Sequence, residues 1–547
     1  MKLSVVFQLL LSVVLLASCA DSTGNRKVVK EFISPGQVVI SGKIVNYDGS
    51  VKTGSITCFD IITRLVNRNI INIDATGRFI ISYEVIHPSM TTLLQLGNNY
   101  RYLYTRPGDT LEINMDLSSG EMEFKNCDNC LNDQFAELRF SLAYNFREKD
   151  GERRRLSSPN ADTLDYKAYC SFLDTLKHDK EIFVENYCDS NIISNEIRDL
   201  FLNEVKYEVA WARMVSYGYT GSDNSYQKRT NLPESFYKDI LTDFPVNNPA
   251  ASCSRNFIDY IANLKDAIIR TAYADKTSAT EYFRNNSELT SEEIDVLTSA
   301  WTGDTIAVES ESYKSLWNEK RDFTSKIVRK YIVSYVLDSL SKFPEGYGRD
   351  IILSQAISES SIKGSYTIIE DSTWQTINSL IMHNEIYDIL RLMYRRMEAG
   401  KQQSLNAESS IRDRITTSDQ QEFYDSLLNK YSGKYVYVDF WATWCGPCKL
   451  EMPFSRSLQN EFKDDNIIFL YLCCESDQES WESYLKTEQM PGEHYLLSSD
   501  ELNYLKEFFK VDGYPSYAIV DPDGKIIDNP PRPSSTEISG YLTKLAQ

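Results

Sequence analysis

The sequence predicts a multidomain protein in which an N-terminal all-β sandwich and a central α-helical domain precede a C-terminal α/β domain. The chain has 547 residues, and a single hydrophobic core rarely serves more than about 250–300 residues. Short β-rich runs come first, apolar residues at helical spacing follow, and strands alternate with helices toward the C-terminus. These changes of pattern predict three domains in that order.

The composition excludes several classes of protein. An apolar share of 42% and a charged share of 25% fit a globular chain, not a polytopic membrane protein or a wholly disordered one. With 58 Lys and Arg against 78 Asp and Glu, the net charge of −20 argues against a nucleic-acid partner. The four histidines leave little material for a histidine metal site, and we predict no metal and no cofactor.

The first residues are typical of an export signal followed by a lipid anchor. Lys2 precedes an apolar run over 5–16 that is too short to span a membrane comfortably. The Leu-Ala-Ser-Cys tetrapeptide that ends at Cys19 resembles a bacterial lipobox, so residues 1–18 are predicted to be a signal peptide and Cys19 the lipidated N-terminus. The alternative is an ordinary signal peptide with an incidental cysteine. Residues 19–30 are polar and predicted to be a tether that holds the body of the protein outside the cytoplasm.

Residues 31–125 are predicted to form the β-sandwich. Apolar and polar residues alternate over 38–45 and again over 77–82, with a turn at 46–49 between strands. Turns rich in Gly, Asp and Pro recur about every 8–12 residues, which is typical of an all-β sandwich.

Residues 131–400 change to helical spacing and are predicted to form about six to nine helices. The Thr-Ser-Glu-Glu run at 290–293 has the pattern of a capping box that opens a helix. His178 and His383 fall inside helical stretches, where we expect a packing or surface role. The polar segment 401–417 is predicted to be a linker, the alternative being the loose start of a helix.

Residues 418–547 alternate between the two periods and are predicted to form the α/β domain. Strands are predicted at 435–440, 467–472, 494–497, 516–520 and 525–527, and helices at 447–462, 478–486, 501–509 and 536–546.

A Cys-Gly-Pro-Cys sequence stands where the first strand of this domain turns into its first helix. Cys445 would lie at the helix N-terminus, partly exposed, where the positive end and unpaired N–H groups of the helix favour a thiolate. Cys448 would lie one turn further on, close enough to attack a mixed disulfide formed by Cys445. Gly446 permits the tight turn, and Pro447 falls in the first helical turn, where a missing N–H costs nothing. A zinc site would need two further ligands, and none stands at suitable spacing.

The run from Val438 to Cys448, the Glu-Met-Pro sequence at 451–453 and the Gly-Tyr-Pro sequence at 513–515 resemble a thioredoxin-fold domain of the TlpA/ResA type. The likeness covers about residues 415–547, and the extra helix and strand after Cys474 match the insert of TlpA-like domains. The turn at 107–111 and the hairpin at 74–79 resemble the β-sandwich that precedes thioredoxin domains in many bacterial lipoproteins.

The resemblance implies a role for each matching residue. Cys445 matches the nucleophile, Cys448 the resolving cysteine, and Asp439 the buried acid that takes a proton from the resolving thiol. Glu451 matches a glutamate near the active site, the alternative being a surface residue of the helix. Pro515 matches the cis-proline that faces the disulfide and exposes backbone to an extended substrate.

Four residues would flank the site: Trp444, Gly446, Pro447 and Tyr514. The Gly-Pro dipeptide is that of thioredoxin itself and indicates a reducing pair, with a reduction potential of about −270 mV.

Two other cysteine pairs remain open. Cys473 and Cys474 end a strand and face opposite ways, which favours core packing over a redox role. Cys127 and Cys130 are compatible with a small structural disulfide, free thiols, a second redox pair or half of a metal site.

The sequence therefore favours a lipid-anchored, periplasm-facing enzyme that reduces protein disulfides. Its expected partners are disulfide-bonded clients, a membrane thiol donor that re-reduces the pair, and the bilayer that holds the anchor. Apocytochrome c is a client by family likeness only. One alternative is a thiol peroxidase, disfavoured because Val438 and Ala442 replace the Pro and Thr of the peroxiredoxin motif before Cys445. The other is a peptide- or glycan-binding lipoprotein with an auxiliary thioredoxin domain.

Overall fold

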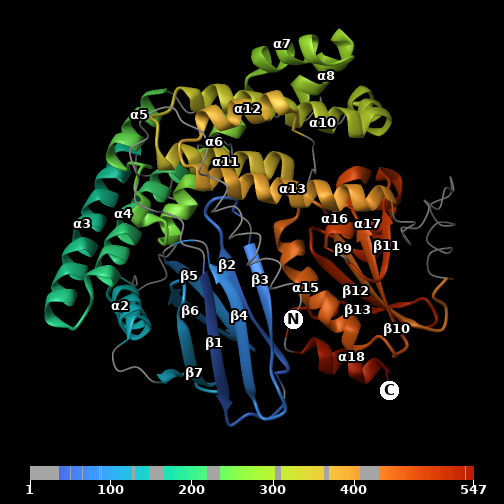
Figure 1. Ribbon diagram of the computed structural model, residues 1–547. Coiled ribbons are helices and arrows are strands. Elements are labelled where there is room, and N and C mark those ends of the chain that lie inside the picture. The colour runs from blue at the N-terminus through green and yellow to red at the C-terminus, as the bar shows by residue number, and fades with distance from the viewer. Residues whose placement is uncertain are drawn as a thin grey trace, which may run out of the picture.

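The computed structural model contains two β-sheets near the N-terminus, a central helical region and a C-terminal α/β domain (Figure 1). It describes residues 36–546 apart from 50, 65, 86, 88, 126–129, 147–165, 218–233, 302–309, 363–368, 407–429, 489 and 536. The predicted signal peptide, tether and Cys19 lie outside the described residues. No helix within the described part of the chain is both long enough and apolar enough to cross a membrane.

The N-terminal region consists of two four-stranded sheets. The strand order of one sheet is β4 (Arg78–Val85), β1 (Gly36–Val45), β7 (Thr110–Asp116) and β8 (Met122–Lys125). That of the other is β3 (Val66–Asn72), β2 (Thr53–Phe59), β5 (Met90–Leu96) and β6 (Asn99–Thr105). The pairing of β1 with β7 is parallel, and the other pairs are antiparallel.

Side-chain alternation explains why these sheets pack face to face. Along β4 every second residue is buried, as expected for a strand with one face on a core. The buried side chains of both sheets, such as Ile40 and Ile113 from one and Ile56 and Leu94 from the other, form one cluster. The strands therefore enclose a shared core, which is the sandwich arrangement that the sequence predicts.

The helical region has more helices than predicted. Eleven α-helices occur among its described residues, against the expected six to nine. They are α2 (Leu131–Asn145), α3 (Tyr166–Ser190), α4 (Asn195–Tyr217), α5 (Glu234–Asp243), α6 (Arg255–Ala274), α7 (Lys276–Asn286), α8 (Ser291–Trp301), α10 (Glu311–Ser341), α11 (Tyr347–Ile357), α12 (Asp371–Leu380) and α13 (Asn384–Asn406). The excess comes from short helices with almost no loop between them; only Asp275 separates α6 from α7, and its side chain caps α7.

Two local predictions in this region have different outcomes. The capping box is confirmed, because the Thr290 N–H donates to Glu293 Oε2 at 2.8 Å and the Glu293 N–H donates to Thr290 Oγ1 at 3.2 Å. The linker prediction is wrong for residues 401–406, which continue α13. The Lys, Gln and Leu residues in this run are good helix formers, so a polar composition does not by itself end the helix. Residues 407–417 lie outside the described part.

The C-terminal domain has a central five-stranded sheet in the order β11-β10-β9-β12-β13. Its elements are β9 (Tyr435–Trp441), α15 (Gly446–Glu461), β10 (Ile467–Cys473), α16 (Gln478–Thr487), β11 (Glu493–Leu496), α17 (Ser499–Phe509), β12 (Ser516–Val520), β13 (Ile526–Asp528) and α18 (Ile538–Ala546). β9, β10 and β11 run parallel, whereas β12 is antiparallel to both β9 and β13. This is the element order predicted from the sequence. Each predicted end lies within two residues of the observed one.

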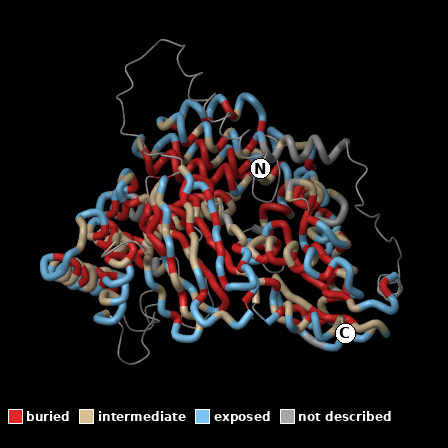
Figure 2. Tube along the Cα trace, turned by 60° about the horizontal axis from the view of Figure 1, so that its bottom comes forward, coloured by how far each residue is buried: buried red, intermediate tan, exposed pale blue. Residues whose placement is uncertain are grey.

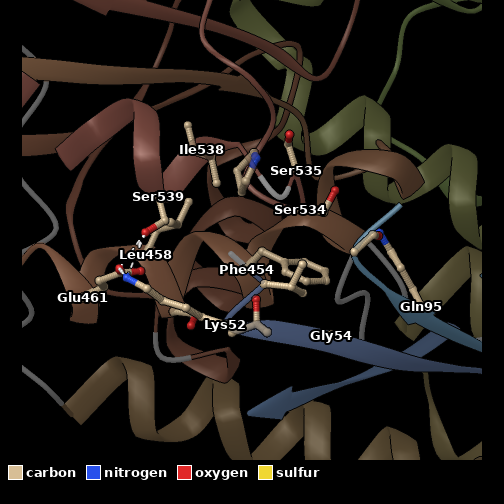
Figure 3. Close-up of a pocket in the computed structure, with 15 residues that line it drawn as sticks. Lys52, Gly54, Gln95, Phe454, Leu458, Glu461, Ser534, Ser535, Ile538 and Ser539 are labelled. Carbon is tan, nitrogen blue, oxygen red and sulfur yellow. Dashed lines mark hydrogen bonds and ion pairs between the residues drawn. The ribbon is translucent and has the colours of Figure 1, made fainter. Parts of the chain in front are cut away.

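The C-terminal domain packs against both other regions. α13 lies along α16, and the buried side chains of the helical region form one continuous cluster with those around α15 (Figures 1 and 2). Two ion pairs join α10 to the start of α16, Arg329 with Asp477 at 2.9 Å and Lys326 with Glu479. On the sandwich side, β3 packs against α15, and the Lys52 ammonium contacts Glu461 at 2.8 Å (Figure 3).

Candidate active site

A disulfide joins Cys445 and Cys448 at the point where β9 passes into α15. Cys445 is the N-cap of the helix, and its Sγ accepts the Cys448 backbone N–H at 3.1 Å. Pro447 occupies the first helical turn, as expected. The sulfur of Cys445 therefore lies where the N–H groups and positive end of the helix favour a negative charge.

The expectation that Cys445 is partly exposed is wrong for this disulfide-bonded form. Its side chain is only 3% exposed and that of Cys448 only 1%. The sulfur of Cys445 turns inward toward the first N–H groups of α15, and the neighbouring Trp444, 58% exposed, takes the surface position. The first thiol is thus distinguished by its place at the helix N-terminus more than by its accessibility.

The loop after β10 organises the rim of the site. The indole N–H of Trp444 donates to the Glu475 carbonyl oxygen at 3.0 Å, and the Tyr514 hydroxyl donates to Glu475 Oε1 at 3.2 Å. Lys506 pairs with the same carboxylate at 2.7 Å. Glu475 has a φ of +46°, a left-handed conformation that non-glycine residues seldom adopt and that is often found near functional sites. Sequence reasoning missed Glu475, because nothing in the run around it marks a left-handed residue.

The peptide bond between Tyr514 and Pro515 is cis, as the resemblance implies. Tyr514 also contacts Trp444 edge to face, with ring centroids 5.9 Å apart. The two predicted flanking aromatics therefore meet at one edge of the site. Gly446 and Gly513 have open space where a side chain would begin, so the backbone on this face is accessible.

Asp439 is buried in the middle of β9. It lies opposite Tyr471 of β10 and Tyr517 of β12, and its Oδ1 has no hydrogen-bond partner among the described residues. Burial raises the pKa of this carboxyl well above its usual value, and the charge of Glu451 raises it further. A carboxyl whose pKa is raised in this way keeps its proton to a higher pH than an exposed one, which is the direction that a general acid–base requires.

Glu451 is also buried, at 4% exposure, so its alternative reading as a surface residue is wrong. It lies three residues after Cys448 on α15, and its carboxylate accepts the N–H and the hydroxyl of Ser534, both at 2.9 Å. Ser534 belongs to the loop before α18. Sequence reasoning could not find the contact between Ser534 and Glu451, because 83 residues separate the two partners.

The remaining cysteines have different outcomes. Cys473 and Cys474 form no disulfide and are fully buried, and they belong to core clusters on opposite faces of the sheet. Burial raises the pKa of Cys474 to about 12, which fits core packing. Cys130 is disulfide-bonded, whereas Cys127 lies outside the described residues, so their pairing stays a prediction.

Histidines and metal-ligating groups give no second site in the described part of the chain. His383 does not lie inside a helix as expected, because α12 ends at Leu380 and α13 begins at Asn384. It lies 2.7 Å from Asp350 and packs edge to face on Tyr347, which is a structural role. No cluster of three or more His, Cys, Asp or Glu side chains that could hold a metal ion occurs among the described residues.

Comparisons with known proteins agree with this geometry. Residues 433–526 match the model of a thioredoxin-like family. The chain is 25% identical over 119 residues to the thiol-disulfide oxidoreductase ResA of Bacillus cereus, covering 22% of this chain and 67% of that protein. It is 28% identical over 123 residues to ResA of Oceanobacillus iheyensis, covering 22% of this chain and 61% of that protein.

A solved structure, the thioredoxin domain of a thiol-disulfide oxidoreductase from Bacteroides vulgatus, is 28% identical. The match covers 22% of this chain and 84% of that one, with a TM-score of 0.21. The chain thus spans 67% and 61% of the length of these two curated relatives, and each match covers 22% of this chain. Residues 433–526 form a thioredoxin-like domain of the kind found in thiol–disulfide oxidoreductases.

Proposed function

We propose that this protein is a membrane-tethered, extracytoplasmic thiol–disulfide oxidoreductase that reduces disulfides in client proteins. The observation that carries the proposal is the Cys445–Cys448 disulfide at a helix N-terminus, with the buried carboxyl of Asp439 on the adjacent strand. A pair of cysteines that only stabilised the fold would have no need of a buried ionisable carboxyl on the strand that leads into it.

The proposed reaction begins with the reduced pair. The Cys445 thiolate attacks a client disulfide, forms a mixed disulfide and releases one client sulfur as a thiolate, which takes a proton from solvent. Cys448 then gives its proton to the Asp439 carboxylate, and its thiolate attacks Cys445 Sγ. The second client sulfur leaves, and the Cys445–Cys448 disulfide forms. Two electrons have passed to the client, and a membrane thiol donor returns the pair to the dithiol form.

The client is proposed to bind as an extended segment along the loop that contains Pro515. Trp444 and Tyr514 border this loop and offer apolar contact, while Glu475 and Lys506 supply polar groups at the same edge. The identity of the client, including apocytochrome c, stays a prediction.

Insulin reduction tests the proposed activity. The full-length protein, kept reduced with dithiothreitol, is expected to precipitate insulin chains well above the rate of dithiothreitol alone, and Cys445→Ser is expected to remove the enhancement. Equal rates for the two proteins would overturn the proposal. Hydroperoxide turnover without insulin reduction would point instead to a thiol peroxidase.

Attachment through Cys19 is tested separately. Because acyl chains contribute about 0.8 kcal/mol per buried CH₂ group, loss of the lipidated cysteine should release the protein. Cys19→Ala is therefore expected to move the protein from the membrane fraction to the soluble fraction. A variant that still sediments with membranes after a carbonate wash would contradict the anchor.

A further inference from the structure

One short loop belongs both to the redox site and to a contact with the helical region. It covers residues 474–477, between the end of β10 and the start of α16, and we call it the rim loop. Helix α16, which follows it, packs against α13 of the helical region. The rim loop therefore lies between the site and the surface on which the helical region rests.

The rim loop fixes the two aromatic side chains that border the site. The Glu475 carbonyl oxygen accepts the Trp444 indole N–H at 3.0 Å, and Glu475 Oε1 accepts the Tyr514 hydroxyl at 3.2 Å. Next along the loop, Ser476 Oγ accepts the N–H of buried Thr443 at 2.9 Å. Because both aromatic side chains are tied to the same few residues, a displacement of the rim loop would move them together.

The last residue of the rim loop is held from the helical region. Asp477 caps α16, because its Oδ1 accepts the Ser480 N–H at 2.9 Å and its Oδ2 accepts the Ser480 hydroxyl at 2.8 Å. Nη2 of Arg329, on α10, also donates to Asp477 Oδ2 at 2.9 Å. The side chain of Asp477 is 6% exposed and that of Arg329 is 22% exposed, so the guanidinium is the counter-charge of a buried carboxylate.

The buried position of Asp477 determines what loss of the Arg329 charge would do. A carboxylate has about four acceptor sites, and Ser480 fills two of them. A buried charge that loses its partner is strongly unfavourable, and it is relieved when the group returns to water. Asp477 can reach water only if the end of the rim loop moves, and Ser476 and Glu475 precede it directly in the chain.

We propose that Arg329 is a positioning residue of the redox site, through which the helical region holds the rim that a client protein contacts. The proposal rests on the disulfide-exchange function and on the client-binding edge proposed above. It gives the helical region a part in client binding, in addition to its packing against the C-terminal domain.

The two sulfurs have a separate support. Cys445 Sγ accepts the Cys448 N–H at 3.1 Å, and the Cys445 N–H donates to the Ala442 carbonyl oxygen at 3.0 Å, so the turn into α15 is closed by its own hydrogen bonds. Loss of the Arg329 charge is therefore expected to weaken client binding more than sulfur chemistry. In kinetic terms, KM for a protein client rises while kcat changes little.

A second ion pair between the same two helices supplies a matched control. Lys326 on α10 pairs with Glu479, which lies in the first turn of α16, beyond the rim loop. Lys326→Met removes one positive charge from α10 and one ion pair from the same interface, but it leaves the contact between Arg329 and Asp477 in place. It therefore separates a general weakening of the interface from an effect on the rim loop.

The test is insulin reduction by the full-length protein, with initial rates measured against insulin concentration. Arg329→Met is expected to raise KM by about fivefold to tenfold and to leave kcat within about twofold of the wild-type value. Arg329→Lys keeps the charge and is expected to keep KM, as is Lys326→Met. Single-turnover reduction of hydroxyethyl disulfide, which has no peptide chain to lie on the rim, should have the same rate in every variant.

A double variant tests whether Arg329 acts through Asp477. Asparagine can still cap α16 but carries no charge, so it does not need the guanidinium. Adding Asp477→Asn to Arg329→Met removes the unpaired carboxylate that displaces the loop. The double variant is therefore expected to have a lower KM than Arg329→Met alone, whereas independent effects would add.

The possible results separate this proposal from the proposed function. With an active wild type, the role of Arg329 alone is overturned by an unchanged KM in Arg329→Met, by an equal rise in Lys326→Met, or by a double variant that is no better than Arg329→Met. A loss of the hydroxyethyl disulfide rate in Arg329→Met would overturn it too, because the sulfurs would then depend on the contact. A wild type that does not reduce insulin overturns the proposed function as well. If Arg329→Met does not fold, Arg329→Gln is the second neutral variant, with the same expected rise in KM.

Discussion

Cys448→Ser protein is expected to accumulate covalent client adducts that dissolve on addition of reductant, whereas Cys445→Ser protein should accumulate almost none. The structure makes the two sulfurs unequal. Cys445 caps α15 and accepts the Cys448 N–H, so the helix favours its thiolate, while Cys448 lies inside the first turn at 1% exposure. A nucleophile without its resolving partner stalls as a mixed disulfide, because no internal thiol can release the client.

Non-reducing gel electrophoresis of cell extracts, followed by identification of the trapped bands, measures this result. The double variant Cys445→Ser/Cys448→Ser is the control, since any adducts it forms come from other cysteines. Alkylation of the reduced wild-type protein at about pH 6 should label Cys445 before Cys448. Adducts that collect on Cys445→Ser, or equal trapping by both single variants, would mean that the assigned roles are reversed or absent.

Local sequence patterns were sufficient to predict the residues that lie within one strand–turn–helix unit. Asp439, Cys445 and Cys448 lie close together in the chain, and the strand β9 and the N-terminal position of the cysteines determine their places. The role of Asp439 itself came from the resemblance. The cis bond before Pro515 and the paired aromatics Trp444 and Tyr514 came from the resemblance, which supplies contacts that spacing alone does not.

Contacts between distant segments could not be predicted in this way. Arg68 reaches the Leu450 carbonyl across 382 residues, and Ser534 reaches Glu451 across 83. Glu451 shows the consequence, because on a helix wheel it is compatible with solvent, and only the packing of β3 and the loop before α18 buries it. The prediction that Cys445 is partly exposed failed for a related reason. The inward turn of its side chain depends on the backbone of the first helical turn, which spacing alone does not show.

Asp439→Asn is expected to slow disulfide reduction by about 10²- to 10⁴-fold at neutral pH, the range for a well-placed general acid–base. Asparagine has nearly the same shape but cannot accept the Cys448 proton, so the resolving step loses its base. The loss should be greatest at high pH, where wild-type Asp439 is ionised, and should shrink at low pH, where the wild-type carboxyl is protonated as well. Stopped-flow or insulin-reduction rates between about pH 6 and pH 9 measure this dependence.

The same substitution is expected to make the protein more stable, and this separates loss of function from loss of fold. Burial and the charge of Glu451 raise the pKa of Asp439 above its unfolded value of about 3.9. Between those two pKa values the folded state binds more protons than the unfolded state, so the free energy of unfolding of the wild type falls as pH rises. Each unit of pKa elevation corresponds to about 1.4 kcal/mol at the high-pH limit.

Asp439→Asn lacks this penalty, so its thermal unfolding midpoint should exceed that of the wild type by a margin that grows from acid to alkaline pH. Glu451→Gln is the matched comparison: it removes the charge that acts on Asp439 but leaves the proton acceptor in place, so it should retain activity. Unchanged rates in Asp439→Asn across the pH range would remove Asp439 from the mechanism and make Glu451 the next candidate base. A slow variant that is also less stable at every pH would mean that Asp439 supports the fold and does not carry the proton.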